Sequence, residues 1–133
     1  MNISEAARRS GLSAKTIRYY EDIKLMNPAV RGANGYRQYN DRAVGELLFL
    51  ARSREVGFNL EESGQLLLLL RDSSGHSVHA KKLVLEKARQ LQQRIDQLNA
   101  MQKVLRTMAK RCSGEEGPDC AILDELAGIG APS

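Results

Sequence analysis

The fold class of this chain is decided by one stretch, Gly11-Leu12-Ser13-Ala14-Lys15-Thr16-Ile17-Arg18-Tyr19-Tyr20-Glu21. Gly11 tolerates the positive φ of a tight turn, and Ser13 is a good N-cap for a helix over residues 14–21. A shorter helix, which Ser4 can cap, precedes the turn. Two short helices joined by a turn that contains glycine are typical of a helix-turn-helix.

The second helix carries side chains suited to phosphates and base edges, namely Lys15, Thr16, Arg18, Tyr19 and Tyr20. A solvated polar face would show a similar pattern. This helix alone therefore leaves both interpretations open.

The helical sequence pattern stops over residues 28–39, and these residues predict a β-hairpin. Asn34-Gly35 is a strong signal for a two-residue type I′ turn, because both central positions of that turn need positive φ. Arg31, Tyr36 and Arg37 flank the turn. A basic hairpin after a helix-turn-helix predicts a wing that can lie on a DNA backbone, although an ordinary hairpin would give the same pattern.

The excess positive charge is confined to the first half of the chain. Residues 1–58 hold ten Lys or Arg and six Asp or Glu, a net charge of +4, whereas residues 59–133 hold ten of each. Phosphate binding needs such a surface, although a mildly basic domain would also show it. A hydrophobic content of 42% with 5% aromatics and no Trp favours packed helices over a sheet sandwich.

Nothing in the sequence suggests export or a membrane partner. No apolar run approaches the roughly 18 residues of a membrane span, and the first residues lack the basic and apolar order of a secretory signal. Two cysteines in such a chain are expected to be reduced. We therefore expect a cytoplasmic protein.

Two more helices are predicted after the hairpin. Asp41 can cap the first, which Gly57 ends. Asn59 can cap the second, with Glu62 at the position that closes a capping box. This second helix contains five consecutive leucines, residues 66–70, and we expect them to be buried on most sides.

Residues 77–111 lack Gly and Pro and predict one long helix, which Ser77 can cap. Its apolar residues recur every three or four positions, as in a heptad seam: Val84, Ala88, Leu91, Ile95, Leu98 and Leu105. A helix of this length is a rod of roughly 50 Å. One chain of this size cannot cover such a stripe, so we expect a homodimer.

Cys112 and Cys120 are the only thiols, and the residues between them include no third soft ligand. Thiolates select Cu(I)-type ions, whereas structural zinc normally takes four nitrogen or sulfur ligands. The pair therefore favours a soft monovalent ion. Its spacing differs from the Cys-x-x-Cys of thiol oxidoreductases, which argues against an enzyme.

Three stretches together resemble the N-terminal pattern of the MerR family of transcription regulators: residues 13–21, residues 34–39 and residues 56–62. The resemblance implies a mainly α protein. It would have a winged helix-turn-helix DNA-binding domain with connecting helices at 1–71, a dimerisation helix at 77–111 that forms an antiparallel coiled coil, and a metal-binding loop with a short terminal helix at 112–133. The implied partners are double-stranded promoter DNA, a second copy of the chain and RNA polymerase.

The C-terminal part is similar to the copper-efflux branch of that family. This similarity implies that Cys112 and Cys120 bind Cu(I), Ag(I) or Au(I) in a linear S–M–S unit, and that metal binding activates transcription by distorting the DNA. Ser77 stands where divalent-metal sensors of the family have a further cysteine, and the family places Lys81 near the metal. Lys24 stands where the family usually has glycine.

Two thiolates and a monovalent ion carry a net charge of −1, which the positive potential at a helix start would stabilise. The choice among Cu(I), Ag(I) and Au(I) stays open. One alternative is a gold-selective or divalent-metal sensor of the same family. An alternative of another class is a cytosolic copper carrier, which would bind metal but not DNA, and the basic winged module argues against it.

Overall fold

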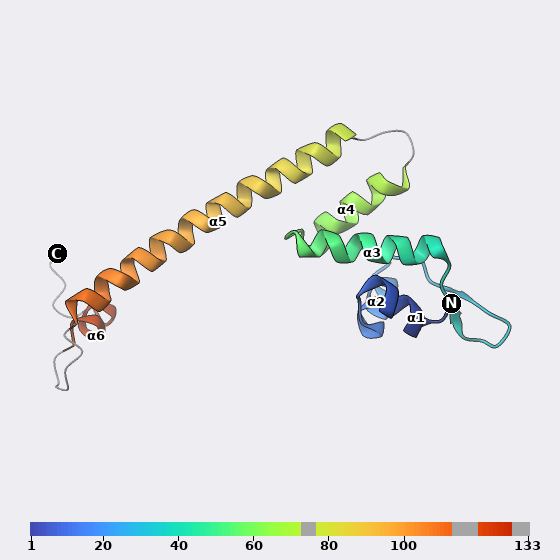
Figure 1. The fold of residues 1–133 in the computed structure, drawn as a ribbon, viewed down its shortest axis with the longest axis horizontal. Helices are drawn as coiled ribbons and strands as arrows, with labels where there is room; N and C mark the ends of the chain where they lie inside the picture. The colour runs from blue at the N-terminus through green and yellow to red at the C-terminus, as the bar shows by residue number, and fades with distance from the viewer. Residues whose placement is uncertain (73–76, 113–119, 129–133) are drawn as a thin grey trace. The chain divides into compact units, whose positions relative to one another are not determined.

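The computed structural model describes residues 1–72, 77–112 and 120–128. Its contacts divide the chain into two units, Met1–Lys87 and Ala88–Ser133. Figure 1 shows the elements in chain order: α1 (Ile3–Ser10), α2 (Ala14–Asp22), β1 (Val30–Arg31), β2 (Arg37–Gln38), α3 (Asp41–Glu55), α4 (Leu60–Arg71), α5 (Ser77–Arg111) and α6 (Ala121–Leu126).

The helix-turn-helix forms as predicted, with one change of cap. Gly11 closes α1 in a left-handed conformation, with φ +79°. The Ser13 hydroxyl accepts a hydrogen bond from the backbone N–H of Thr16 at 3.0 Å, which confirms Ser13 as the cap of α2. The predicted cap Ser4 is wrong, because α1 already begins at Ile3 and the Asn2 side chain caps it.

The hairpin forms, but its predicted type I′ turn is wrong. Val30 pairs with Gln38 and Arg31 with Arg37, antiparallel. Three residues, 33–35, form the loop, in which Gly35 has φ +79° and Asn34 keeps a negative φ. The Asn34 side chain accepts a hydrogen bond from the backbone N–H of Tyr36 at 3.1 Å. Such a side-chain turn replaces the two left-handed residues of a type I′ turn with a single glycine.

The first unit has one apolar core. Helix α3 lies between the α1–α2 pair and α4, as Figure 1 shows, and α1 contacts both α2 and α3. Asn40, not the predicted Asp41, caps α3 through a 2.8 Å hydrogen bond from Ala43. The core residues come from α1, α2, α3 and α4 and from both sides of the hairpin: Ala6, Ile17, Tyr20, Met26, Tyr39, Val44, Leu47, Leu50 and Leu67.

Helix α4 has the predicted capping box, because Asn59 and Glu62 each accept a 2.8 Å hydrogen bond from the other's backbone. The leucine run differs from prediction. Leu67 is 1% exposed, but Leu68 is 65% and Leu70 53% exposed. Leu70 lies three positions after Leu67, on nearly the same face of α4, and lines an open groove with Leu48 and Phe49 of α3. The described part of the chain leaves both Leu68 and Leu70 largely exposed.

Helix α5 begins at Ser77, which makes Ser77 its first residue instead of its cap. Its predicted apolar stripe is open along its length in the single chain: Val84, Leu91, Ile95, Leu98 and Leu105 are each between 39% and 61% exposed. Of the helices in the described part of the chain, none combines the length and apolarity of a membrane span.

Candidate DNA interface and thiol pair

Helix α2 presents most of its predicted DNA-binding residues on its outer face. Lys15, Arg18 and Tyr19 are exposed, and Thr16 is half-buried. Tyr20 is different, because its side chain is only 1% exposed and belongs to the core. The helical period places Tyr20 three positions after the buried Ile17, on the same face. Tyr20 therefore packs in the core, although it also borders a cleft with Thr16 and Tyr19, and its role in DNA contact stays a prediction.

Arg18 of α2 and the predicted basic residues of the hairpin meet in one cleft. Arg18, Arg31, Tyr36 and Arg37 line a concavity of about 600 Å³, together with Asn2 and Ser4 at the start of α1. Arg31 is oriented within it by a 2.8 Å hydrogen bond from its Nη1 to the carbonyl oxygen of Gly35. Guanidinium groups suit the geometry of phosphate oxygens, so three of them around one cleft agree with the predicted DNA contact.

A second cleft lies against α2 and includes residues that the sequence reasoning missed. Thr16 and Tyr19 line it with Arg54 and with the α3–α4 turn, in a volume of about 580 Å³. Arg54 Nη1 donates a hydrogen bond to the Tyr20 hydroxyl at 3.0 Å. No local pattern marks Arg54 as a neighbour of α2, because the contact joins residues 34 positions apart.

Arg37 is held in place from α2. Its Nε lies 3.3 Å from a carboxylate oxygen of Glu21, and the Tyr39 hydroxyl donates to the other oxygen of that carboxylate. Burial, and then the Glu21 carboxylate, raise the pKa of Tyr39 above its ordinary value. Tyr39 therefore remains a hydrogen-bond donor at neutral pH, and the hairpin is fixed to α2, which is the second helix of the helix-turn-helix and is called the recognition helix below.

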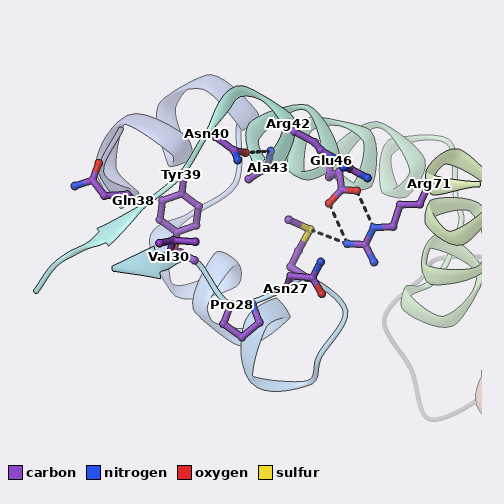
Figure 2. Close-up of a pocket in the computed structure, with 12 residues that line it drawn as sticks. Asn27, Pro28, Val30, Gln38, Tyr39, Asn40, Arg42, Ala43, Glu46 and Arg71 are labelled. Atoms are coloured by element: carbon purple, nitrogen blue, oxygen red, sulfur yellow. Dashed lines mark hydrogen bonds and ion pairs between the residues drawn. The ribbon is translucent and has the colours of Figure 1, made fainter. Parts of the chain in front are cut away.

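The other side of the hairpin base borders a pocket of about 300 Å³, shown in Figure 2. Arg71, the last residue of α4, reaches Glu46 of α3 with two hydrogen bonds, of 2.7 and 2.9 Å. These hydrogen bonds lower the pKa of Glu46. None of the predicted DNA or metal residues lines this pocket, and the Glu46–Arg71 pair serves to fasten the end of α4 to α3.

The two cysteines come together in the second unit. Cys112 follows α5, Cys120 precedes α6, and their sulfur atoms lie 3.6 Å apart. Both are partly buried, and the predicted loop residues 113–119 lie outside the described part. The backbone N–H of Leu123, followed by the Cys112 thiol, lowers the pKa of Cys120. A lower pKa favours the thiolate, which is the form that binds metals.

The donor set fits a soft metal ion. Two sulfur atoms at 3.6 Å can bind one ion between them. Within the residues that the structure describes, no three His, Cys, Asp or Glu side chains gather, so the arrangement lacks the four-ligand set of structural zinc there. Ser77 and Lys81 are exposed and belong to the first unit, so their predicted role beside the metal of a partner chain stays a prediction.

Comparison with known proteins identifies the family. The family described as MerR family regulatory protein matches residues 2–39, and the family described as MerR, DNA binding matches residues 44–108. The HTH-type transcriptional regulator CueR of Salmonella typhi is 44% identical over 128 residues, which cover 96% of this chain and 93% of that protein. An uncharacterised HTH-type transcriptional regulator of Pseudomonas aeruginosa is 45% identical over 127 residues, or 96% of each chain.

The fold agrees with this assignment. The transcription regulator PbrR691 of Ralstonia metallidurans CH34, solved in complex with lead(II), superimposes with a TM-score of 0.84 at 26% identity and covers 95% of this chain and 98% of that one. The chain belongs to the MerR family: it is a transcription regulator and not an enzyme. The mainly α fold with a helix-turn-helix, a hairpin wing and a long α5 is confirmed.

Proposed function

We propose that this protein is a cytoplasmic homodimer that binds double-stranded promoter DNA and activates transcription when Cu(I), Ag(I) or Au(I) binds to Cys112 and Cys120. The observation that carries the proposal is the 3.6 Å thiol pair in a chain that also has a basic winged helix-turn-helix. The resemblance to the copper-efflux branch and the 44% identity to CueR support it.

The DNA interface uses the two clefts beside α2. Arg18, Arg31 and Arg37 bind backbone phosphates in the wing cleft, with Tyr36 at the hairpin. Lys15, Thr16 and Tyr19 on the outer face of α2 contact the groove or its phosphates. Phosphate contacts supply affinity and register, while base-edge contacts supply sequence preference.

The thiol pair is the effector site. A monovalent ion joins the two thiolates of Cys112 and Cys120, and the net charge of the unit is −1. The start of the partner's α5, with Ser77 and Lys81, provides positive potential without a further anion. Ser77 has a hydroxyl where a third thiolate would favour divalent ions, so the site prefers monovalent ions.

Dimerisation supplies cover for the α5 stripe. Leu98 and Leu105 are 56% and 61% exposed in the single chain, and an antiparallel coiled coil with a second copy buries such a seam. Metal binding then distorts the promoter DNA, so that RNA polymerase can contact both of the promoter elements that it recognises. The coupling requires that the ion bind one state of the dimer more tightly than the other.

The test combines metal and DNA binding on the full, reduced chain. One Cu(I) per chain is expected, with two sulfur neighbours in X-ray absorption. Cys112→Ser and Cys120→Ser should each abolish Ag(I) binding, while affinity for a duplex selected from a randomised pool stays nearly unchanged. Three or more sulfur or nitrogen neighbours would contradict the two-thiolate site. Metal binding without affinity for any selected duplex would favour the copper carrier.

A divalent-metal sensor of the same family is the second candidate. The specific observation in its favour is the fold similarity to PbrR691, whose structure contains lead(II). Titration of Zn(II), Hg(II) and Pb(II) beside Ag(I), at equal thiol reduction, separates the two candidates. Tighter binding of a divalent ion than of Ag(I) would make this candidate the better one.

A further inference from the structure

Lys87 of α5, the last residue of the first unit, is held against α4 and the turn before it. Its Nζ lies 2.8 Å from Oε1 of Glu62, and the Lys87 side chain is only 11% exposed. The same ammonium lies 5.8 Å from the centre of the Phe58 ring. Ordering a long lysine side chain costs conformational entropy, so a lysine withdrawn from water between a carboxylate and a ring differs from an ordinary surface cation.

The partner of Lys87 also closes the start of α4. Oε1 of Glu62 accepts the backbone N–H of Asn59 at 2.8 Å, so one oxygen atom serves both the capping box and the ion pair. Phe58, directly before Asn59, is 8% exposed. The preceding Gly57 has a positive φ of 99°. The Lys87 ammonium therefore contacts the turn of residues 56–59 directly at Phe58, and indirectly through Glu62, which accepts the backbone N–H of Asn59.

That turn forms one wall of the second cleft beside the recognition helix. Gly57, Phe58 and Asn59 line it together with Thr16 and Tyr19. A displacement of the turn therefore changes the surface that lies next to the exposed face of α2. Helix α5 continues without a break from Ser77 to Arg111, and Cys112 follows directly. Lys87 thus connects the helix that precedes the thiol pair to a wall of the DNA-facing cleft.

We propose that Lys87 is a positioning residue, which holds the α3–α4 turn in place beside α2 through its contacts with Glu62 and Phe58. The shape of the second cleft beside α2 then depends on the position of Lys87 in α5. The proposal rests on the proposed function for its metal response. The ion pair of Lys87 is with Glu62, so loss of either partner of the pair should change the cleft in the same direction.

The test uses variants that separate the ion pair from the cap. Lys87→Met removes the cation and keeps an apolar stem, and Lys87→Arg keeps the charge. Glu62→Gln removes the ion pair but retains a capping box, since glutamine closes the same motif. Lys82→Met removes an exposed lysine from the same part of α5 and is the matched control. Circular dichroism and thermal unfolding check that each variant is folded.

The readouts are affinity for a duplex selected by the metal-free wild type, and fluorescence of 2-aminopurine at its centre, with and without Ag(I). Lys87→Met and Glu62→Gln should each change the metal-free affinity or the Ag(I) response by about threefold or more, within the range that residues between coupled sites produce. The double variant should show no further change, because both substitutions remove one interaction. Lys87→Arg should restore the response, and Lys82→Met should match the wild type.

Unchanged affinity and response in folded Lys87→Met would overturn the inference, as would additive effects of Lys87→Met and Glu62→Gln. A wild type that binds Ag(I) but shows no change in the duplex would contradict the proposed function. The metal-free affinities of the variants still decide the positioning role of Lys87 in that case, so the two failures are distinguishable.

Discussion

Glu21 of the recognition helix accepts the hydroxyl hydrogen of Tyr39, a residue 18 positions later at the end of the hairpin. Glu21 is 8% and Tyr39 3% exposed, so the contact is almost sealed from water. The same carboxylate pairs with Arg37 at 3.3 Å. The orientation of the wing relative to α2 is therefore fixed by one buried carboxylate.

Removal of the Tyr39 hydroxyl tests this relationship. Tyr39→Phe leaves one oxygen of a buried carboxylate without its donor, so the free energy of unfolding should fall by about 1–3 kcal/mol. Urea denaturation measures the change. Tyr36→Phe is the control, because Tyr36 is 71% exposed, and surface changes of this kind stay within about 0.5 kcal/mol. Equal stability of the two variants would contradict a structural role for the Glu21–Tyr39 contact.

Acid should weaken the contact between Glu46 and Arg71. The hydrogen bonds from Arg71 lower the folded-state pKa of Glu46 below 4.5, its ordinary value. A lowered pKa gives stability that is present above the unfolded-state pKa and is lost as the pH falls through the folded-state pKa. The wild type should therefore lose stability below about pH 4.5 more steeply than Glu46→Gln, which lacks the ion pair at every pH.

Chemical denaturation of both proteins between pH 7 and pH 3 measures this difference. At pH 7 Glu46→Gln should be less stable by about 1.5–3 kcal/mol, the range for hydrogen bonds to charged groups. The difference between the two proteins should shrink as the pH falls. A stability difference that stays constant from pH 7 to pH 3 would contradict a contribution of the ionised Glu46–Arg71 pair to stability.

Lys24 adopts a conformation that suits glycine better. Its φ is +63°. The backbone N–H of Lys24 donates a hydrogen bond to the carbonyl oxygen of Glu21, and the backbone N–H of Leu25 donates one to the carbonyl oxygen of Tyr20. This is the Schellman ending of a helix, in which glycine usually occupies the left-handed position. Lys24→Gly should raise the free energy of unfolding by up to about 1 kcal/mol, since a side chain there costs about that much. Lys24→Ala should give no such gain, and a loss of stability in Lys24→Gly would contradict the strain.

Local sequence rules predicted the caps that depend on a few neighbouring residues. Ser13 and Asn59 cap their helices as expected, because each hydrogen bond closes within three residues. The cap of α1 was placed two residues late, because Asn2 and Ser4 are both competent caps and sequence alone does not rank them. The hairpin turn was predicted in place but not in type, because the Asn34 side chain bonds to Tyr36.

Local sequence rules do not predict contacts between residues that lie far apart in the chain. Tyr20 was assigned to DNA by its chemistry, although the helical phase shared with Ile17 buries it. The contacts of Arg54 with Tyr20 and of Lys87 with Glu62 join segments whose sequences carry no sign of each other. The exposed Leu68 and Leu70 show the opposite case, in which sequence predicts burial that one chain does not provide.

Salt dependence should reveal which arginines of the wing cleft meet phosphates. Arg18→Ala and Arg31→Ala should each reduce the slope of log affinity against log salt by roughly one unit, because each removes one phosphate contact. Lys103→Ala, on the exposed surface of α5 in the second unit, is the control and should leave the slope unchanged. Unchanged slopes in both arginine variants would place the DNA elsewhere. Arg37 is a less clean probe, because it also pairs with Glu21.

Ser77 should determine which ions the thiol pair accepts. It stands where divalent-metal sensors of the family have a cysteine, and we expect the start of the partner's α5 to lie near Cys112 and Cys120. Ser77→Cys would then bring a third thiolate to the site. Three thiolates with a divalent ion have a net charge of −1, the same as two thiolates with Ag(I). The variant should therefore gain Zn(II) or Hg(II) binding while it still binds Ag(I).

Zn(II) titration of the wild type and Ser77→Cys at equal thiol reduction measures this gain, and Ser77→Ala controls for the loss of the hydroxyl. Because Ser77 is the first residue of α5 and not its described cap, thermal unfolding of Ser77→Ala should differ little from that of the wild type. Ser77→Cys combined with Cys112→Ser should lose the gain, since only two thiols then remain. Equal, weak Zn(II) binding in the wild type and in Ser77→Cys would show that residue 77 is remote from the metal, and the preference for monovalent ions would need another cause.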